Sequence, residues 1–272
     1  MPTAPGVPAS RSDQAGPEPQ HLHPDRFDFL TFDCYGTLVD WEAGIIAAVR
    51  EVCAADGIAP GAPRRRHHRA GQAADPQAVP TDAAILAAFG DSEHVVQADR
   101  YRTYRDVLAL TLDRMGHALG FRPTSAERDA FAASVRDWPP FPDTVDALAR
   151  LATRYRLGIV SNVDDDLFAE TARHLHTDFD WIVTAQQVGS YKPALAHFKE
   201  MAMRSGISSD RTLHVAQSLF HDIAPASALG YATVHVNRPS RAGGSGATPP
   251  ADARPDATVT DMAGVAHMLG VA

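Results

Sequence analysis

The sequence has little cysteine and no long apolar run, and each scarcity excludes a class of protein. Its 272 residues include only two cysteines, too few for a disulfide framework. No stretch approaches the roughly 18 consecutive apolar residues that a membrane-spanning helix needs. Residues 1–20 also lack the apolar segment of a secretory signal. We therefore expect a cytoplasmic protein with no membrane partner.

Positive charge is scarce as well, and lysine most of all. The chain carries 25 Lys and Arg against 33 Asp and Glu, a net charge of −8. Such a surface repels polyanions, so we expect no nucleic-acid partner. Only Lys192 and Lys199 are lysine, whereas every other basic residue is arginine. A lysine that persists against this bias can be needed for its compact ammonium group, which makes Lys192 a candidate functional residue.

The hydrophobic pattern predicts an α/β protein with a helical insert. Strands are expected at 27–33, 157–161, 180–184, 212–216 and 232–236. Helices are expected between and after the later strands, at 143–154, 165–175, 193–205 and 222–229. Strand–helix alternation of this kind indicates a Rossmann-like parallel sheet with helices on both faces.

The chain divides into three parts on this pattern. Residues 1–26, rich in Pro, Ala and Gly, are predicted to be a disordered arm. Residues 27–40 and 138–272 form the α/β core, and residues 41–137 form an all-helical insert after the first strand. Within the insert, a helix at 41–55 and a Pro/Gly-rich loop at 56–82 precede a helical stretch, in which Thr124 and Glu127 open a helix. A flexible loop at 239–256 precedes a last strand and helix.

Polar residues cluster where four of these core segments end. The motifs are Asp33-Cys34-Tyr35-Gly36-Thr37, Ser161-Asn162, Tyr191-Lys192-Pro193 and Gln217-Ser218-Leu219-Phe220-His221-Asp222. Ligands of open α/β sheets bind beyond the carboxyl ends of the strands, so we expect these residues to face one crevice. A carboxylate, hydroxyls, an amide, an ammonium and a second carboxylate together suit nucleophilic catalysis with electrostatic support.

In this order, the four motifs resemble those of the haloacid dehalogenase superfamily, over roughly residues 27–238. The segments Phe-Asp-x-Tyr-Gly-Thr-Leu and Val-x-Ser-Tyr-Lys-Pro are most similar to the type II (S)-2-haloacid dehalogenases. The resemblance implies that the helical insert is the cap domain of that superfamily. It also implies a hydrolase that needs no cofactor and acts on a small anionic substrate.

The resemblance further implies a role for each motif residue. Asp33 would be the nucleophile that forms an ester with the substrate, and Lys192 would keep Asp33 ionised. Asp222 would position or activate the hydrolytic water. The residues expected to bind substrate or line its pocket are Tyr35, Thr37, Ser161, Asn162, Gln217, Ser218 and His221.

Two positions favour attack at carbon over attack at phosphorus. Phosphatases of the superfamily carry a second Asp at the position of Tyr35, and this Asp protonates a departing alkoxide, whereas a halide leaves without a proton. Gln217 stands where those phosphatases have a carboxylate near Mg²⁺. Any metal would then be left with Asp33 and Asp222. We therefore expect dehalogenation of a 2-haloacid or a related anion.

Three alternatives stay open at this point. The first is a Mg²⁺-dependent small-molecule phosphatase, and the second is an epoxide hydrolase with Tyr35 or His221 as the acid. The third is a binding protein without turnover. His221 could equally be an exposed loop histidine. An arginine that grips a substrate carboxylate has several candidates, namely Arg100, Arg102, Arg105 and the run Arg64-Arg65-Arg66. A homodimer is possible.

Overall fold

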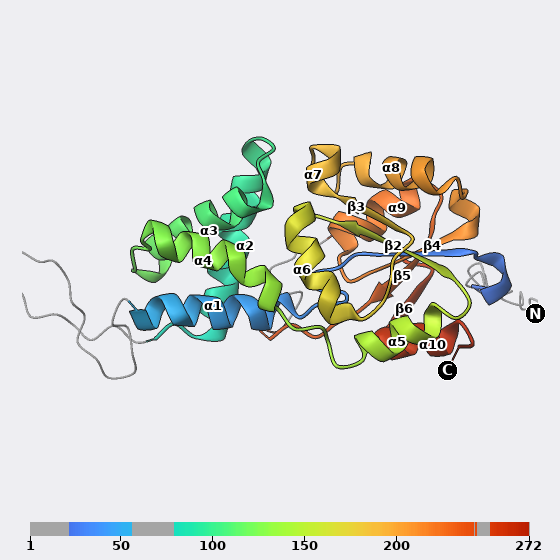
Figure 1. The fold of residues 1–272 in the computed structure, drawn as a ribbon, viewed down its shortest axis with the longest axis horizontal. Helices are drawn as coiled ribbons and strands as arrows, with labels where there is room; N and C mark the ends of the chain where they lie inside the picture. Colours follow the sequence, from blue (N-terminus) through green and yellow to red (C-terminus); the bar gives the residue numbers. More distant parts are fainter. Residues whose placement is uncertain (1–21, 56–78, 242, 244–250, 272) are drawn as a thin grey trace, which may run out of the picture.

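A parallel sheet of six strands lies at the centre of the molecule (Figure 1). The computed structural model describes residues 22–55, 79–241, 243 and 251–271. The order β3-β2-β1-β4-β5-β6 confirms the predicted parallel sheet. The strands are β1 (Phe29–Phe32), β2 (Arg156–Ser161), β3 (Trp181–Thr184), β4 (Thr212–Ala216), β5 (Ala232–Val236) and β6 (Ala257–Val259).

Helices cover both faces of the sheet, as the sequence predicts (Figure 1). On one face Phe198 and Met201 pack with Phe29 of β1. On the other face Leu148 and Val265 belong to the larger hydrophobic cluster. Because both faces are covered, all four residues of β1 are buried. The helices are α8 (Ala196–Ser205) and α9 (Ala224–Ala228) on the first face, and α5 (Thr144–Leu151), α6 (Asp165–Leu175) and α10 (Met262–Met268) on the second.

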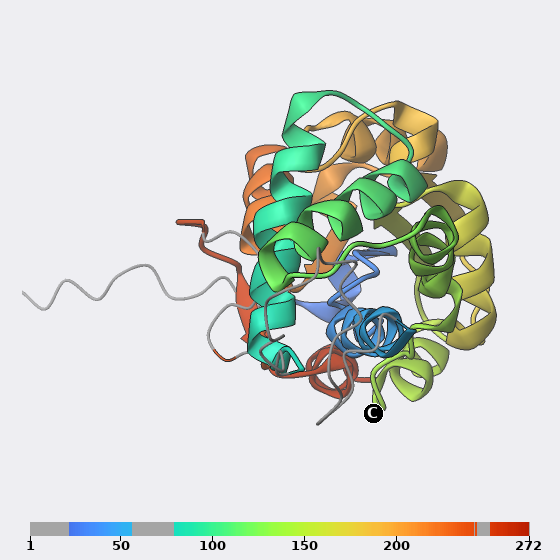
Figure 2. The ribbon, with the colours of Figure 1, turned by 90° about the vertical axis from the view of Figure 1, so that its left-hand side faces the viewer.

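The described part of the segment between β1 and α5 is mostly helical and stands beyond the carboxyl ends of the strands (Figures 1 and 2). Its helices are α1 (Trp41–Ala55), α2 (Asp82–Asp99), α3 (Tyr104–Leu119), α4 (Ser125–Ala133) and the 3₁₀ helix η2 (Ser134–Asp137). Thr124 and Glu127 form the predicted capping box at the start of α4. The boundaries 41 and 137 of a separate cap domain stay a prediction.

One predicted helix begins later in the structure than in the sequence analysis. The helix expected at 193–205 begins at Ala196. The side chain of Asn162 holds the backbone of Lys192, and the Ala194 N–H donates to the Tyr191 carbonyl in a turn. These contacts hold residues 191–194 in a turn, so the helix begins only after them.

A second predicted helix is divided. The segment expected as one helix at 222–229 belongs to the π-helix η4 (Leu219–Ile223) followed by α9. Three short elements were not predicted at all. They are the 3₁₀ helices η1 (Pro24–Arg26) and η3 (Ser209–Arg211) and the one-turn helix α7 (Ala185–Val188).

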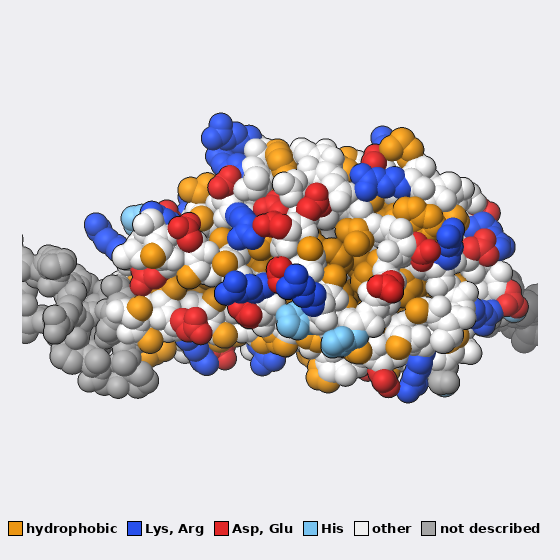
Figure 3. Space-filling view, viewed as in Figure 1, with side chains coloured by type: hydrophobic (Ala, Val, Ile, Leu, Met, Phe, Trp, Pro, Cys, Tyr) orange, Lys and Arg blue, Asp and Glu red, His pale blue; other side chains and the backbone are white. Residues whose placement is uncertain are grey.

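Several expectations lie outside the described residues. These are residues 1–21 of the predicted arm (1–26), residues 56–78 of the predicted loop (56–82) with the arginine run at 64–66, and positions 242 and 244–250 of the C-terminal loop. Among the described helices, none has the length and apolar character to cross a membrane. On the face in Figure 3, acidic and basic side chains are interspersed, as in an ordinary water-exposed surface.

Candidate active site

The register of the sheet brings the ends of three strands together. Phe32, the last residue of β1, pairs with Ile159 of β2 on one side and with Val215 of β4 on the other. Asp33 therefore leaves the sheet beside the ends of both neighbouring strands. The chain order reverses at this place, between β1, β2 and β4, and such switch points are where open α/β sheets bind ligands.

A tight turn follows Asp33 and returns the chain past the site. Gly36 adopts a φ of +99°, a conformation that residues with a Cβ rarely take. A Cβ at this position would lie 3.0 Å from the indole nitrogen of Trp41. Glycine is therefore required both for the backbone angle and for the close approach of α1.

The ammonium of Lys192 joins the two aspartates. Its Nζ donates to Asp33 Oδ1 at 2.9 Å, to Asp222 Oδ1 at 2.6 Å and to the Val160 carbonyl at 2.7 Å. All three ammonium hydrogens are thus used. The Lys192 side chain is only 1% exposed and that of Asp33 10% exposed. The sequence expectation that these three residues meet is correct in its geometry.

Burial and pairing oppose each other in this cluster. Burial disfavours charge on Lys192, but Asp222 and Asp33 outweigh it and raise the pKa of the ammonium. Burial also raises the pKa of Asp33, against the effect of Lys192. For Asp222, burial acts in the same upward direction, yet Lys192 and His214 together lower its pKa to about 2. Lys192 is therefore charged and Asp222 ionised at neutral pH.

A buried histidine that the sequence analysis did not select supports Asp222 from behind. His214 of β4 lies with Nε2 3.2 Å from Asp222 Oδ1 and with Nδ1 2.9 Å from the hydroxyl of Thr31. Thr31 and His214 are register partners in neighbouring strands, so their side chains share one face of the sheet. The sequence can indicate this pairing only after the order of the strands is known.

The second oxygen of Asp33 is also held. The hydroxyl of Thr37 donates to Asp33 Oδ2 at 2.8 Å and accepts from the Gln217 N–H at 2.9 Å. Thr37 therefore links the loop after β1 to the loop after β4. Both oxygens of the carboxylate are fixed in orientation, as a nucleophile requires.

The two residues of the Ser161-Asn162 motif have different environments. Asn162 accepts from the Lys192 N–H at 2.7 Å and donates to the Lys192 carbonyl at 3.2 Å, so its amide holds the lysine backbone. Ser161 is buried, and its hydroxyl has no hydrogen-bond partner within the described chain. A buried polar group without a partner is costly, and Ser161 lines the cavity where a ligand could satisfy it.

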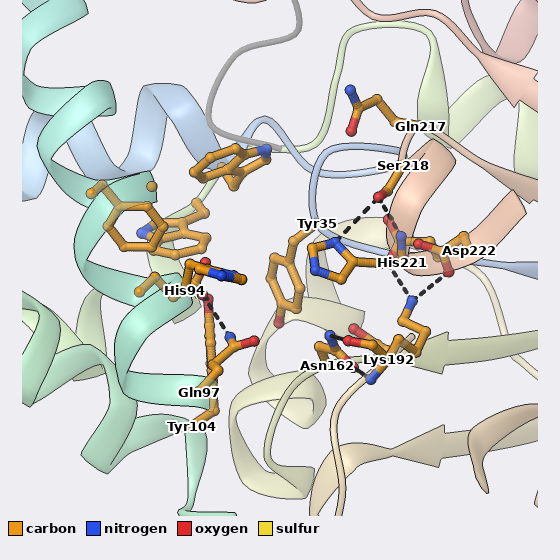
Figure 4. A pocket seen from close by; sticks show the side chains of 17 residues that line it. Tyr35, His94, Gln97, Tyr104, Asn162, Lys192, Gln217, Ser218, His221 and Asp222 are labelled. Carbon is orange, nitrogen blue, oxygen red and sulfur yellow. Dashed lines mark hydrogen bonds and ion pairs between the residues drawn. The ribbon is translucent and has the colours of Figure 1, made fainter. Parts of the chain in front are cut away.

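A cavity of about 100 Å³ opens over Asp33 between the sheet and the helices (Figure 4). We call its two sides the core wall and the helical wall, with Trp138 at their junction. The core wall comprises Asp33, Tyr35, Ser161, Asn162, Lys192, Gln217, Ser218, His221 and Asp222. The helical wall comprises Trp41, Phe89, Gly90, Glu93, His94, Gln97 and Tyr104.

The helical wall contains polar residues that sequence reasoning missed. Glu93 Oε1 accepts from the Tyr104 hydroxyl at 2.9 Å and from Gln97 Nε2 at 3.1 Å. Burial raises the pKa of Glu93 from its usual 4.5 to about 7. His94 and Gln97 lie across the cavity from His221 and Lys192 (Figure 4). The available signal was the helical spacing of residues 89, 93 and 97, which places them on one face of α2.

His221 lies in the cavity wall, which favours the functional interpretation over an exposed loop residue. Its Nδ1 is 3.2 Å from the Ser218 hydroxyl, which also accepts from the His221 N–H at 2.9 Å. Burial lowers the pKa of His221 to about 4. The ring is therefore neutral at pH 7. Both Ser218 and His221 line the cavity, as expected.

Tyr35 lines the cavity with its ring, but its hydroxyl is committed elsewhere. The Thr171 hydroxyl donates to the Leu167 carbonyl, and the Tyr35 hydroxyl lies 2.8 Å from Thr171 Oγ1. Tyr35 is therefore the donor in that pair. Burial also raises its pKa well above the usual value. This arrangement disfavours Tyr35 as the acid of an epoxide hydrolase.

None of the described residues that line the cavity is an arginine. Arg105 forms an ion pair with Asp166 at 2.6 Å. Arg102 donates to the Val96 carbonyl at 3.2 Å, and Arg100 is exposed. The structure thus does not bring the three described candidates for a carboxylate-binding arginine to the site.

The side chains of the site offer two carboxylates to a magnesium ion, those of Asp33 and Asp222. No group of three or more His, Cys, Asp or Glu within the described chain could hold a metal. The two candidate ligands, Asp33 and Asp222, each give an oxygen to the Lys192 ammonium, so a cation already lies between them. Magnesium takes near-octahedral oxygen ligands and favours additional carboxylates or phosphates.

Comparisons with known proteins agree with this architecture. A defluorinating L-2-haloacid dehalogenase shares the fold with a TM-score of 0.69, at 23% identity over 89% of this chain and 95% of that one. The L-2-haloacid dehalogenase of Xanthobacter autotrophicus with covalently bound chloropropionic acid gives a TM-score of 0.71, at 18% identity over 90% and 100% of the two chains.

A sequence relative carries a different description. The glyceraldehyde 3-phosphate phosphatase of Methanothermobacter thermautotrophicus is 34% identical over 101 residues, which is 36% of this chain and 45% of that protein. The match thus spans less than half the length of this relative. The family model of the haloacid dehalogenase-like hydrolases matches residues 27–230, most of the chain. The protein therefore belongs to the haloacid dehalogenase-like hydrolases.

Proposed function

We propose that the protein hydrolyses a carbon–halogen bond through an ester on Asp33. The observation that carries the proposal is the Lys192 ammonium, shared between Asp33 at 2.9 Å and Asp222 at 2.6 Å beneath the cavity. A carboxylate held in a fixed orientation beside an ammonium group, in a largely buried site, is suited to act as a nucleophile toward carbon.

The first step exchanges one bond for another. An oxygen of Asp33 attacks the substrate carbon, a carbon–oxygen bond forms, and the carbon–halogen bond breaks. The halide leaves with the bonding electron pair and needs no proton. This suits a core wall in which the Tyr35 hydroxyl donates to Thr171 and so offers no acid to a leaving group.

The second step restores the nucleophile. Water adds to the carbonyl carbon of the Asp33 ester, the acyl carbon–oxygen bond breaks, and the alcohol product leaves with one proton. The other proton passes to solvent as the carboxylate is regenerated. Asp222, which lines the cavity and fixes Lys192, is the group we assign to position this water. The free hydroxyl of Ser161 is the proposed contact for a polar substrate atom.

A magnesium-dependent phosphatase is the second candidate, because the partial sequence relative is named as a phosphatase. A bound magnesium ion would neutralise phosphate charge, and Asp33 and Asp222 would be its protein ligands. The ammonium between these carboxylates and the presence of Gln217 near them weigh against it.

Product analysis separates the two candidates. We expect chloride release from a 2-chloro compound that persists in EDTA and is absent from Asp33→Ala. The panel contains 2-chloropropionate, 2-chloropropionamide and p-nitrophenyl phosphate. Phosphate release that requires added Mg²⁺ would replace the proposal with the phosphatase. Ligand binding without any turnover would indicate a non-catalytic protein.

A further inference from the structure

The helical wall carries one carboxylate, that of Glu93. Oε1 of Glu93 is taken by Tyr104 and Gln97, whereas no donor in the described chain contacts Oε2. Glu93 lines the cavity and is half-buried. An acceptor oxygen fixed in this way is suited to a hydrogen-bond donor on a ligand.

Among the described residues that line the cavity, carboxylic side chains outnumber lysine and arginine side chains. Three carboxylic side chains line it, those of Asp33, Glu93 and Asp222. Lys192 has all three hydrogens committed within the core wall. The two histidines that line the cavity are His94 and His221, and the second is neutral at pH 7. Lys192 therefore has no ammonium hydrogen left for an anionic group of the substrate on the helical side.

We infer that the substrate group facing the helical wall is a hydrogen-bond donor, such as an amide, a hydroxyl or an amine, and that Glu93 selects it over a carboxylate. This departs from the small anionic substrate that the sequence analysis expects. The inference rests on the proposed function in that the same cavity is the substrate site. It assigns Glu93 to specificity, with Tyr104 and Gln97 as positioning residues.

Binding of unreactive ligands tests this without any bond breaking. Lactamide and lactate have nearly the same shape and differ in charge and in donor capacity. Trp41 and Trp138 line the cavity, so intrinsic fluorescence can report binding. At pH 8 we expect lactamide to bind at least about tenfold more tightly than lactate, because like charges a few ångströms apart repel.

The variant Glu93→Gln isolates the charge. Its amide keeps a carbonyl oxygen for Tyr104 and Gln97 and loses the anionic oxygen. We expect the lactamide-to-lactate preference to narrow to within about threefold, mostly through tighter lactate binding. The matched control is Asp91→Asn, which removes an exposed carboxylate from the same helix and should leave the preference as in the wild type.

Each outcome decides the inference. Equal or tighter binding of lactate, an unchanged preference in Glu93→Gln, an equal change in Asp91→Asn, or binding of neither ligand would overturn it. Chloride release is measured in parallel from 2-chloropropionamide and 2-chloropropionate. Lactamide preference without chloride release would remove the proposed reaction and keep the specificity of Glu93. Chloride release that favours the carboxylate would keep the reaction and remove the specificity.

Discussion

The core wall and the helical wall of the cavity treat their charges differently. In the core wall, Lys192 gives every ammonium hydrogen to a fixed acceptor, and each oxygen of Asp33 has a donor. In the helical wall, Glu93 has donors on one oxygen and none from the described chain on the other. Under the proposed function, the first wall holds the attacking carboxylate, and the second leaves an acceptor oxygen for another part of the substrate.

This difference reflects how each wall is built. The core wall is anchored on strand ends whose positions are fixed by the register of a buried sheet. The helical wall comes from α1, α2 and α3, which stand beyond the carboxyl edge of the sheet (Figure 1). Sites on rigid elements keep precise geometry, whereas more peripheral elements can change their side chains without disturbing the reaction centre.

The largest expected effect is the loss of the nucleophile. Asp33→Ala should lower kcat for chloride release by at least about 10³-fold, because the variant lacks the carboxylate that forms the proposed ester. Steady-state chloride assays measure this, and binding of lactamide reports whether the cavity persists. Retention of a tenth of the wild-type rate would mean that the core wall does not act through Asp33.

The two lysines provide the next test of the core wall. Lys192→Met leaves two buried carboxylates without their shared cation and should cost about 3–5 kcal/mol of folding stability, with loss of activity. Lys199→Met changes an exposed lysine of the following helix. It should leave the folding stability and the activity unchanged within experimental error. Urea unfolding measures the stability of each. Similar stability losses in both variants would contradict the role of the buried network.

The pH dependence of folding stability tests the buried carboxyl group of Glu93 in the helical wall. The pKa of Glu93 is about 7 in the native protein and near 4.5 when unfolded. Between these values the native state binds more protons, so this group makes stability fall as pH rises. Relative to wild type, Glu93→Gln should therefore gain stability from pH 4.5 to pH 7.5, by at most about 3 kcal/mol.

Thermal or urea unfolding at both pH values checks this prediction. Tyr104 is the titratable group hydrogen-bonded to Glu93, and Gln97 is its neutral neighbour. The Asp91→Asn variant is the control for a general change in surface charge. A constant difference between Glu93→Gln and wild type across the range would show that the Glu93 carboxyl titrates normally.

A smaller loss of stability is expected from a contact between the core and the start of α3. Asp164, in the loop after β2, accepts from the Tyr104 N–H at 2.9 Å and the Arg105 N–H at 3.0 Å at the start of α3. A carboxylate suits a helix N-terminus. Asp164→Ala should cost about 1–2 kcal/mol, measured by urea unfolding, and Asp164→Asn about half as much. Equal stability of all three proteins would mean that this contact does not hold α3.

The core wall could be predicted from the sequence, and the helical wall could not. Parallel strands bring their carboxyl ends to one edge, so the order of Asp33, Ser161, Lys192 and Asp222 along the chain was enough to expect their meeting. The sequence analysis missed His214 because its pairing with Thr31 depends on the order of the strands in the sheet. The sequence analysis missed Glu93 because a polar residue in a helix can be assigned to a site only when the packing of that helix is known.

The same reasoning explains the errors at element ends. The start of α8 depends on contacts between Asn162 and Lys192, which are 30 residues apart. Asp164, next to the start of α6, likewise has a distant partner, since it accepts a hydrogen bond at the start of α3 across 60 residues of chain. Local propensity does not contain such contacts.

Isotope labelling of Asp33 tests the central claim most directly. The protein is incubated in H₂¹⁸O with 2-chloropropionamide and 2-chloropropionate in separate reactions, and the peptide that contains Asp33 is weighed by mass spectrometry. Because water attacks the ester carbonyl, we predict that ¹⁸O enters the Asp33 carboxylate and that the first-turnover product carries ¹⁶O. Label in the product alone, with an unlabelled Asp33 peptide, would mean that water attacks the substrate directly and would contradict the account.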